Sequence, residues 1–141
     1  MDIDKKVWEV LCSEEEINQR ITEMGKQISE EYEGKNLYVI SLLKGSFVFT
    51  ADLVRKISIP VKIGFMTTSS YGHSDTSSGK VQMKADITDD LEEYDVMVVD
   101  DIVDSGITMN FVLEHLKTKN PKSLASCVLL DKPSRRQIFM E

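Results

Sequence analysis

The 141-residue sequence has no apolar run long enough to cross a membrane. Its N-terminus, Met1-Asp2-Ile3-Asp4-Lys5-Lys6, lacks the apolar core of a secretory signal peptide. Cysteine is scarce too, because Cys12 and Cys127 are the only two, and their separation matches no metal-ligand spacing. We interpret both as buried free thiols and expect a cytoplasmic protein, since thiols stay reduced in that compartment.

Positive charge is in short supply as well. The 17 Lys and Arg residues face 24 Asp and Glu residues, which gives a formal net charge of −7. Proteins that bind nucleic acids neutralise phosphates with Lys and Arg, so this balance argues against a nucleic-acid partner. An anionic ligand would need local positive charge, metal ions or backbone dipoles.

What the sequence does contain is typical of one folded domain with its own core. Hydrophobic residues make up 41% and charged residues 29%. Short apolar runs that predict strands alternate with helical patterns. The strands are expected at 37–43, 61–66, 96–99 and 124–130, and the helices between Ser13 and Gly34, at 47–57 and at 109–117. This alternation predicts an α/β fold, a parallel twisted sheet flanked by helices.

Residues 67–85 differ from the rest of the chain. Their middle, from Gly72 to Gly79, has no large apolar side chain and a glycine at each end. We expect a protruding β-hairpin with a mobile tip, which could close over a ligand.

The most informative stretch runs from Val96 to Thr108. An apolar strand pattern leads into Asp100 and Asp101, and Asp104 follows in a Ser/Gly/Thr turn that opens a helix. Two adjacent acids after an apolar strand repel each other, which favours a functional role over a solvated turn. Carboxylates can bind sugar hydroxyls or a hard cation, and a helix N-terminus can bind a phosphate.

Two further signals fall on the same predicted edge of the sheet. Lys44-Gly45-Ser46 ends the first main strand, where a glycine lets backbone N–H groups approach a ligand. Lys132 directly follows the last strand and can present a donor above the sheet. His73 and His115 have no partner spacing, and we expect both to be solvated.

Together these residues resemble the purine phosphoribosyltransferases of type I, specifically the bacterial hypoxanthine (hypoxanthine-guanine) enzymes, along essentially the whole chain. Val96–Thr108 is similar to the family's phosphoribosyl-pyrophosphate signature, and Leu43-Lys44-Gly45-Ser46 to its pyrophosphate loop. Ser70-Tyr71 resembles the start of the loop over the active site, and Leu129–Pro133 the purine-specifying segment. The resemblance implies a single phosphoribosyltransferase domain over 1–141, with 67–85 as its mobile catalytic hairpin.

The resemblance also implies a role for each residue. Asp100 and Asp101 would bind the ribose hydroxyls and Mg²⁺, and Lys44 and Gly45 would bind pyrophosphate, with a cis peptide between Leu43 and Lys44. The 5′-phosphate would be held by Asp104, Ser105, Gly106, Ile107 and Thr108.

Purine recognition and proton transfer complete the implied site. Asp104 would also act as general base or acid at purine N7. Lys132 would donate to the oxygen at C6, and Ile102 would pack on the base.

The implied reaction converts phosphoribosyl pyrophosphate and hypoxanthine or guanine into IMP or GMP and pyrophosphate, in a homo-dimer or homo-tetramer.

Two features depart from the family. The acidic pair is Asp-Asp where many relatives carry Glu-Asp, and relatives continue past the equivalent of Glu141 with a base-stacking aromatic residue, a carboxylate and an arginine. Without these groups we expect weak purine binding but a persistent phosphate cradle. A catalytically incomplete fragment and a non-catalytic nucleotide-binding regulator therefore stay open as alternatives. The sequence leaves open the preference among hypoxanthine, guanine and xanthine.

Overall fold

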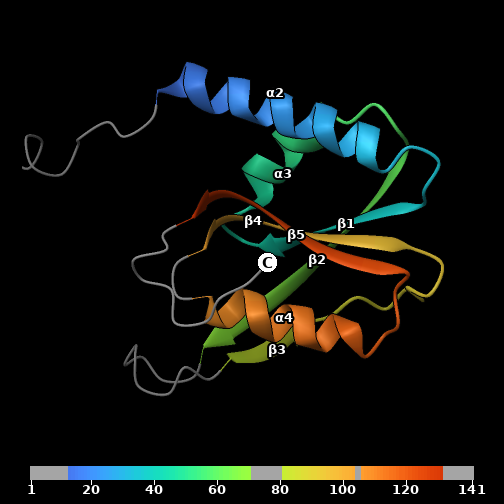
Figure 1. The fold of residues 1–141 in the computed structure, drawn as a ribbon. Helices are drawn as coiled ribbons and strands as arrows, with labels where there is room; N and C mark the ends of the chain where they lie inside the picture. The colour runs from blue at the N-terminus through green and yellow to red at the C-terminus, as the bar shows by residue number, and fades with distance from the viewer. Residues whose placement is uncertain (1–12, 71–80, 104–105, 132–141) are drawn as a thin grey trace, which may run out of the picture.

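A computed structural model describes residues 13–70, 81–103 and 106–131. Within these ranges one sheet has the strand order β3-β2-β1-β4-β5 (Figure 1). The elements in chain order are α2 (Glu14–Glu31), β1 (Leu37–Leu43), α3 (Phe47–Val54), β2 (Val61–Ser70), β3 (Val81–Ala85), β4 (Asp95–Val103), α4 (Ile107–Lys117) and β5 (Ser123–Asp131). Strands β2, β1, β4 and β5 pair in parallel, and β3 joins β2 antiparallel at one edge. The predicted α/β architecture is confirmed.

Helix α2 begins with the capping box expected from the sequence. The Ser13 hydroxyl accepts a hydrogen bond from the Glu16 N–H at 3.1 Å, and the Glu16 carboxylate accepts one from the Ser13 N–H at 2.8 Å. Ile21, Met24 and Ile28 are buried on the face toward the sheet. The helical spacing of these residues therefore correctly identified the buried face.

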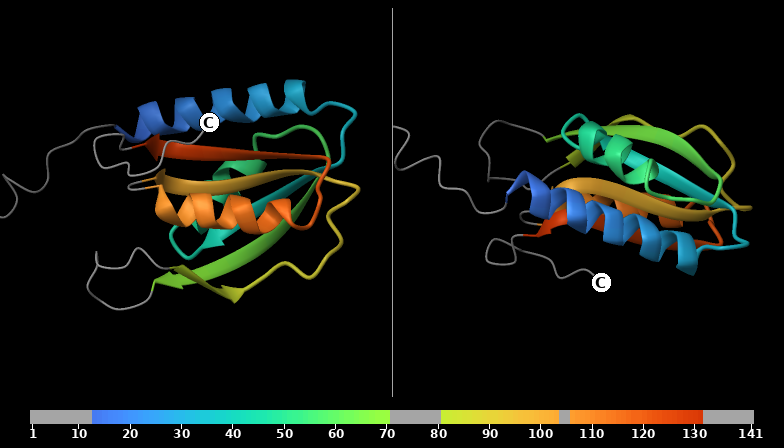
Figure 2. Two further views of the ribbon diagram at one scale, coloured as in Figure 1. Left: turned by 60° about the horizontal axis from the view of Figure 1, so that its bottom comes forward. Right: turned by 90° about the horizontal axis from the view of Figure 1, so that it is seen from above.

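The sheet separates two hydrophobic cores. Figures 1 and 2 show α2 and α3 on one side of it and α4 on the other. Side chains of β1 and β4 point alternately into the two cores. Val39 and Val99 pack with α2 and α3, whereas Ile40 and Val98 pack with α4. Among the described residues, no helix has both the length and the apolar character needed to span a membrane.

Strand β4 is longer than the predicted 96–99, and this changes where the acidic pair lies. Asp100 and Asp101 are inside the strand and do not follow it. Pairing of β4 with β1 ends at Ser41 and Val99, whereas pairing with β5 continues to Val103. The hydrogen bonds to β5 extend the strand through residues of low strand propensity, so the acids lie beyond the last residues at which β4 pairs with β1.

The base of the predicted hairpin is present. Strand β2 extends to Ser70, which pairs with Val81, and a register shift falls between Thr67 and Thr68. The tip expected at 72–79 lies outside the described residues. Helix α3 ends at Val54 and is shorter than the predicted 47–57.

Candidate functional site

The acidic pair forms the centre of the candidate site. Asp100 and Asp101 are consecutive residues near the end of β4, past the last residues that pair with β1. The Asp101 N–H donates to the Asp100 carboxylate at 2.9 Å. Burial, reinforced by the nearby carboxylate of Asp101, raises the pKa of Asp100 to about 7. The pair is therefore poised for a cation or hydroxyl donors that stabilise its ionised form.

The turn after β1 lies directly against this pair. Gly45 is exposed, and a Cβ placed on it would lie 3.6 Å from each carboxylate oxygen of Asp101. Lys44, which precedes Gly45, is also exposed, and the peptide bond between Leu43 and Lys44 is cis, as predicted. One turn thus brings a positive charge and a glycine backbone beside the carboxylates.

The N-terminus of α4 completes the described part of the site. Helix α4 begins at Ile107, four residues after β4 ends at Val103. Gly106 caps the helix with φ 89°, a left-handed conformation that favours glycine. The first turn of a helix presents backbone N–H groups and the positive end of its dipole, which suits a phosphate next to the acidic pair.

A buried hydroxyl cluster that the sequence did not reveal supports the turn at residues 44–46. The Ser41 hydroxyl lies 2.7 Å from those of Ser46 and Thr50, and the Ser46 hydroxyl donates to the Leu42 carbonyl. All three side chains are buried. They join the end of β1 to the start of α3, so they fix the two ends of this turn. In the sequence, only Ser41, a small polar residue within an apolar run, pointed to this cluster.

The structure brings Lys44, Gly45, Asp100, Asp101 and the start of α4 to one edge of the sheet, as predicted. Ser70 and Ile102 belong to β2 and β4. The remaining predicted residues, Tyr71, Asp104, Ser105 and Lys132, lie outside the described part of the chain.

Whether Mg²⁺ fits this site depends on the donor set. Within 13–70, 81–103 and 106–131, no group of three or more His, Cys, Asp and Glu residues could hold a metal ion. Mg²⁺ is commonly held by one or two carboxylates, with substrate phosphates and water as its other ligands. Asp100 and Asp101 supply two such carboxylates. A bound cation would favour the ionised form of Asp100, so the pair fits the ion.

His115 is partly exposed, and it has a partner that the sequence did not predict. Its Nε2 lies 2.7 Å from the Asp86 carboxylate, and Lys119 approaches the same carboxylate at 3.7 Å. Although burial opposes it, the hydrogen bond from His115 lowers the pKa of Asp86. This cluster ties α4 to the segment after β3 and lies outside the candidate site.

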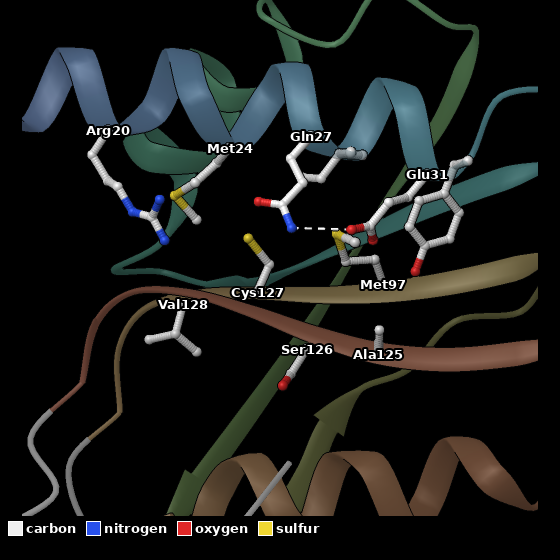
Figure 3. A pocket seen from close by; sticks show the side chains of 11 residues that line it. Arg20, Met24, Gln27, Glu31, Met97, Ala125, Ser126, Cys127 and Val128 are labelled. Carbon is white, nitrogen blue, oxygen red and sulfur yellow. Dashed lines mark hydrogen bonds between the residues drawn. The ribbon is translucent and has the colours of Figure 1, made fainter.

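A separate groove of about 310 Å³ lies between α2 and the strands β4 and β5 (Figure 3). Cys127 points into it toward α2, whereas Ser126 and Val128 point to the other side of β5. Burial raises the pKa of the Cys127 thiol to about 11, so the thiol is neutral. None of the predicted site residues lines the groove. Cys127 is a free thiol, as predicted, but it is half-buried and not fully buried. Cys12 lies outside the described residues.

Comparison with known proteins agrees with this arrangement. The family model of the phosphoribosyl transferase domain matches residues 8–137. The hypoxanthine phosphoribosyltransferase of Salmonella typhimurium is 46% identical over 136 residues, covering 95% of this chain and 76% of that protein. The hypoxanthine-guanine phosphoribosyltransferase of Dictyostelium discoideum is 45% identical over 128 residues, covering 88% and 71%.

The fold is shared with solved structures as well. The crystal structure of a hypoxanthine phosphoribosyltransferase from Staphylococcus aureus matches with a TM-score of 0.91 at 36% identity, covering 100% of this chain and 77% of that one. With the family model spanning most of the sequence and relatives this similar, the chain belongs to the phosphoribosyltransferase family.

Proposed function

We propose that this protein transfers phosphoribose from phosphoribosyl pyrophosphate to hypoxanthine or guanine, giving IMP or GMP and pyrophosphate. The observation that carries the proposal is the close approach of the Gly45 turn to the Asp101 carboxylate, in the strand that precedes α4. These three elements match the three parts of the donor substrate: a pyrophosphate, a ribose and a 5′-phosphate. The names of the relatives supply the acceptor, a 6-oxopurine.

The donor substrate is held along the edge of the sheet. The carboxylates of Asp100 and Asp101 accept hydrogen bonds from the ribose hydroxyls. Lys44 and the backbone around Gly45 bind the pyrophosphate, while the first turn of α4 binds the 5′-phosphate. Mg²⁺, when bound at the acidic pair, supplies positive charge that stabilises the departing pyrophosphate.

The chemical step forms the bond from purine N9 to the sugar carbon C1 and breaks the bond from C1 to the pyrophosphate oxygen. The purine loses one proton as it becomes neutral, and we assign Asp104 as the base that takes it. Lys132 donates to the oxygen at C6 and Ile102 packs on the base, which holds the acceptor in line with C1. Closure of the 67–85 hairpin, beginning at Ser70 and Tyr71, would exclude water that could hydrolyse the donor.

The proposal is tested by incubating the purified chain with Mg²⁺, phosphoribosyl pyrophosphate and hypoxanthine, then with guanine and xanthine. We expect IMP and pyrophosphate in equal amounts, and GMP from guanine, with product lost when EDTA is added. The amounts of product formed from hypoxanthine, guanine and xanthine show which base the protein prefers. We expect the cytoplasmic location and the dimeric or tetrameric state as further predictions.

An Asp101→Asn variant tests the role of the carboxylate, because asparagine keeps the shape of the side chain but carries no charge. We expect turnover to fall by at least 100-fold, the scale expected when one electrostatic partner of the transition state is lost. Binding of phosphoribosyl pyrophosphate by the wild type without any turnover would favour the nucleotide-binding regulator or the incomplete fragment. A wild-type chain that binds no phosphoribosyl pyrophosphate would contradict the proposal outright.

A further inference from the structure

A carboxylate directly after β3 is held by two residues at the end of α4. The Nε2 atom of His115 lies 2.7 Å from Oδ2 of Asp86, and because an ionised carboxylate only accepts hydrogen bonds, the ring is the donor. The ammonium of Lys119 lies 3.7 Å from the same oxygen and donates to the Ile87 carbonyl at 3.4 Å. The end of α4 therefore holds both a side chain and the backbone of the segment after β3.

This contact differs from an ordinary surface ion pair, which contributes little. The side chains of His115 and Asp86 are 31% and 32% exposed, so both are largely withdrawn from water. The other Asp86 oxygen accepts a hydrogen bond from the Ile87 N–H at 2.7 Å, and the Phe111 ring stacks on His115 with 12° between the two planes. Both partners are thus held in one orientation. We name the contact of Asp86 with His115 and Lys119 the Asp86 anchor.

Strand β3 depends on such an anchor because it lies at the edge of the sheet. It pairs with β2 alone, and the register of that pairing shifts between Thr67 and Thr68. Met83 of β3 and Ile87 pack into the core under α4. Apolar packing is non-directional, so it does not by itself fix where β3 lies along the helix. A hydrogen bond of defined geometry between Asp86 and α4 does fix it.

The anchor ties together two elements that both begin at the candidate site. Strand β3 begins at Val81, the partner of Ser70 at the end of β2, and α4 begins at Ile107, soon after the end of β4. Both elements run away from that edge of the sheet and contact each other (Figure 1). The extended chain from Asp86 back to Val81 spans about 16 Å, and the helix from His115 back to Ile107 spans about 12 Å. The anchor therefore keeps the paired ends of β2 and β3 near the level of the first turn of α4.

We propose that His115 is a positioning residue for the donor site: through Asp86 it fixes β3, and with it the paired end of β2, beside the helix assigned to the 5′-phosphate. The inference rests on the proposed function, which also assigns residues 67–85 to the exclusion of water. With β3 misplaced, a water molecule can lose a proton and bond to C1 as the pyrophosphate leaves, which gives ribose 5-phosphate in place of IMP. His115 lies at the far end of α4, so it acts through the strand and not on the reacting atoms.

Hydrogen exchange of the substrate-free protein, followed by mass spectrometry, tests the position of the strand. We expect His115→Ala to speed exchange about tenfold in peptides covering β3 and the end of β2, the scale of one lost hydrogen bond to a charged group, and to leave β1 and β4 unchanged. His115→Gln retains an N–H donor and should restore exchange to within about twofold of the wild type. Lys117→Ala is the matched control, because Lys117 pairs with Glu114 on the same helix.

The balance of products tests the consequence for the reaction. We expect the wild type to release pyrophosphate and IMP in equal amounts, and His115→Ala to release pyrophosphate in about twofold excess or more. The KM for phosphoribosyl pyrophosphate should change little, because the buried Met109, Val112 and Leu116 keep α4 in place. Asp86→Asn removes the charge from the other side of the contact and should give the same excess, whereas His115→Gln should restore the balance.

Circular dichroism checks that each variant is folded, and Asp86→Asn takes the place of His115→Ala if the latter unfolds. Unchanged exchange in the folded variant overturns the proposal, and so does faster exchange throughout the sheet, which would mean a general loss of stability. Folded variants that keep the two products in balance also overturn it. A wild type that forms no IMP contradicts the proposed function, and exchange, measured without substrate, then decides whether His115 positions β3.

Discussion

Gly45 faces the carboxylate of Asp101 closely enough that a Cβ on residue 45 would lie 3.6 Å from both of its oxygens. That distance is ordinary van der Waals contact, so the fold itself accepts an alanine at this position. Any ligand held between the turn and the acidic pair would meet the added methyl group. We therefore predict that the glycine is needed for binding and not for folding.

We predict that Gly45→Ala leaves the unfolding temperature unchanged and raises the KM for phosphoribosyl pyrophosphate severalfold. Gly34→Ala is the matched control. Gly34 has φ 80° and open space around its Cβ position, so alanine there should cost about 1–2 kcal/mol of stability without changing KM. Steady-state kinetics and thermal unfolding of both variants separate the two effects, and an unchanged KM in Gly45→Ala would remove the turn from the donor site.

The acidic pair makes stability depend on pH. The pKa of Asp100 is raised to about 7, against about 3.9 in an unfolded chain. Folding therefore favours the protonated acid, whose contribution to stability is complete below about pH 3.9 and is lost as the pH rises through about 7. In EDTA we expect Asp100→Asn to gain stability relative to the wild type between about pH 4 and pH 8.

Mg²⁺ should reverse this loss. At about pH 8 we expect added Mg²⁺ to raise the unfolding temperature of the wild type more than that of Asp100→Asn, because the ion stabilises the ionised pair. Scanning calorimetry with and without EDTA measures both effects. Parallel pH profiles for the two proteins would show that Asp100 titrates normally.

The buried hydroxyl cluster should contribute to both stability and substrate binding. Thr50→Val keeps the shape of the side chain but removes one partner of Ser41, and we predict a loss of about 1 kcal/mol. Ser46→Ala removes the hydroxyl that joins Ser41 to the Leu42 carbonyl and should cost about 1–3 kcal/mol and raise the KM for phosphoribosyl pyrophosphate. Urea unfolding measures the first effect, with Thr50→Ser, which retains the hydroxyl, as the control.

The left-handed cap of α4 offers a further test. Gly106→Ala should cost about 1–2 kcal/mol, because φ is 89° at this position, and should weaken phosphate binding by distorting the first turn. Gly106→Asn should be milder, since asparagine tolerates this conformation better. Equal losses for alanine and asparagine would mean that the conformation of residue 106 is not the cause.

The local pattern of the sequence predicted the parallel sheet, the capping box at Ser13 and the convergence of Lys44, Gly45 and the acidic pair. It did not predict that Asp100 and Asp101 lie inside β4, because their strand conformation depends on hydrogen bonds to β5, a partner distant in sequence. The contact of His115 with Asp86 spans 29 residues and was missed for the same reason. Residues 41, 46 and 50 are close in the sequence, but the sequence alone did not predict that their hydroxyls meet, because this depends on how α3 turns back on β1.

We propose above all that the turn at Gly45, the acidic pair and the start of α4 bind one phosphoribosyl pyrophosphate. Isothermal titration of this compound into the wild type and Asp101→Asn, with Mg²⁺ present and no purine, tests it without relying on turnover. We expect one site per chain in the wild type and binding at least tenfold weaker in the variant, the scale of one lost charged contact. Equal affinity in the two proteins, or no binding to the wild type, would contradict it.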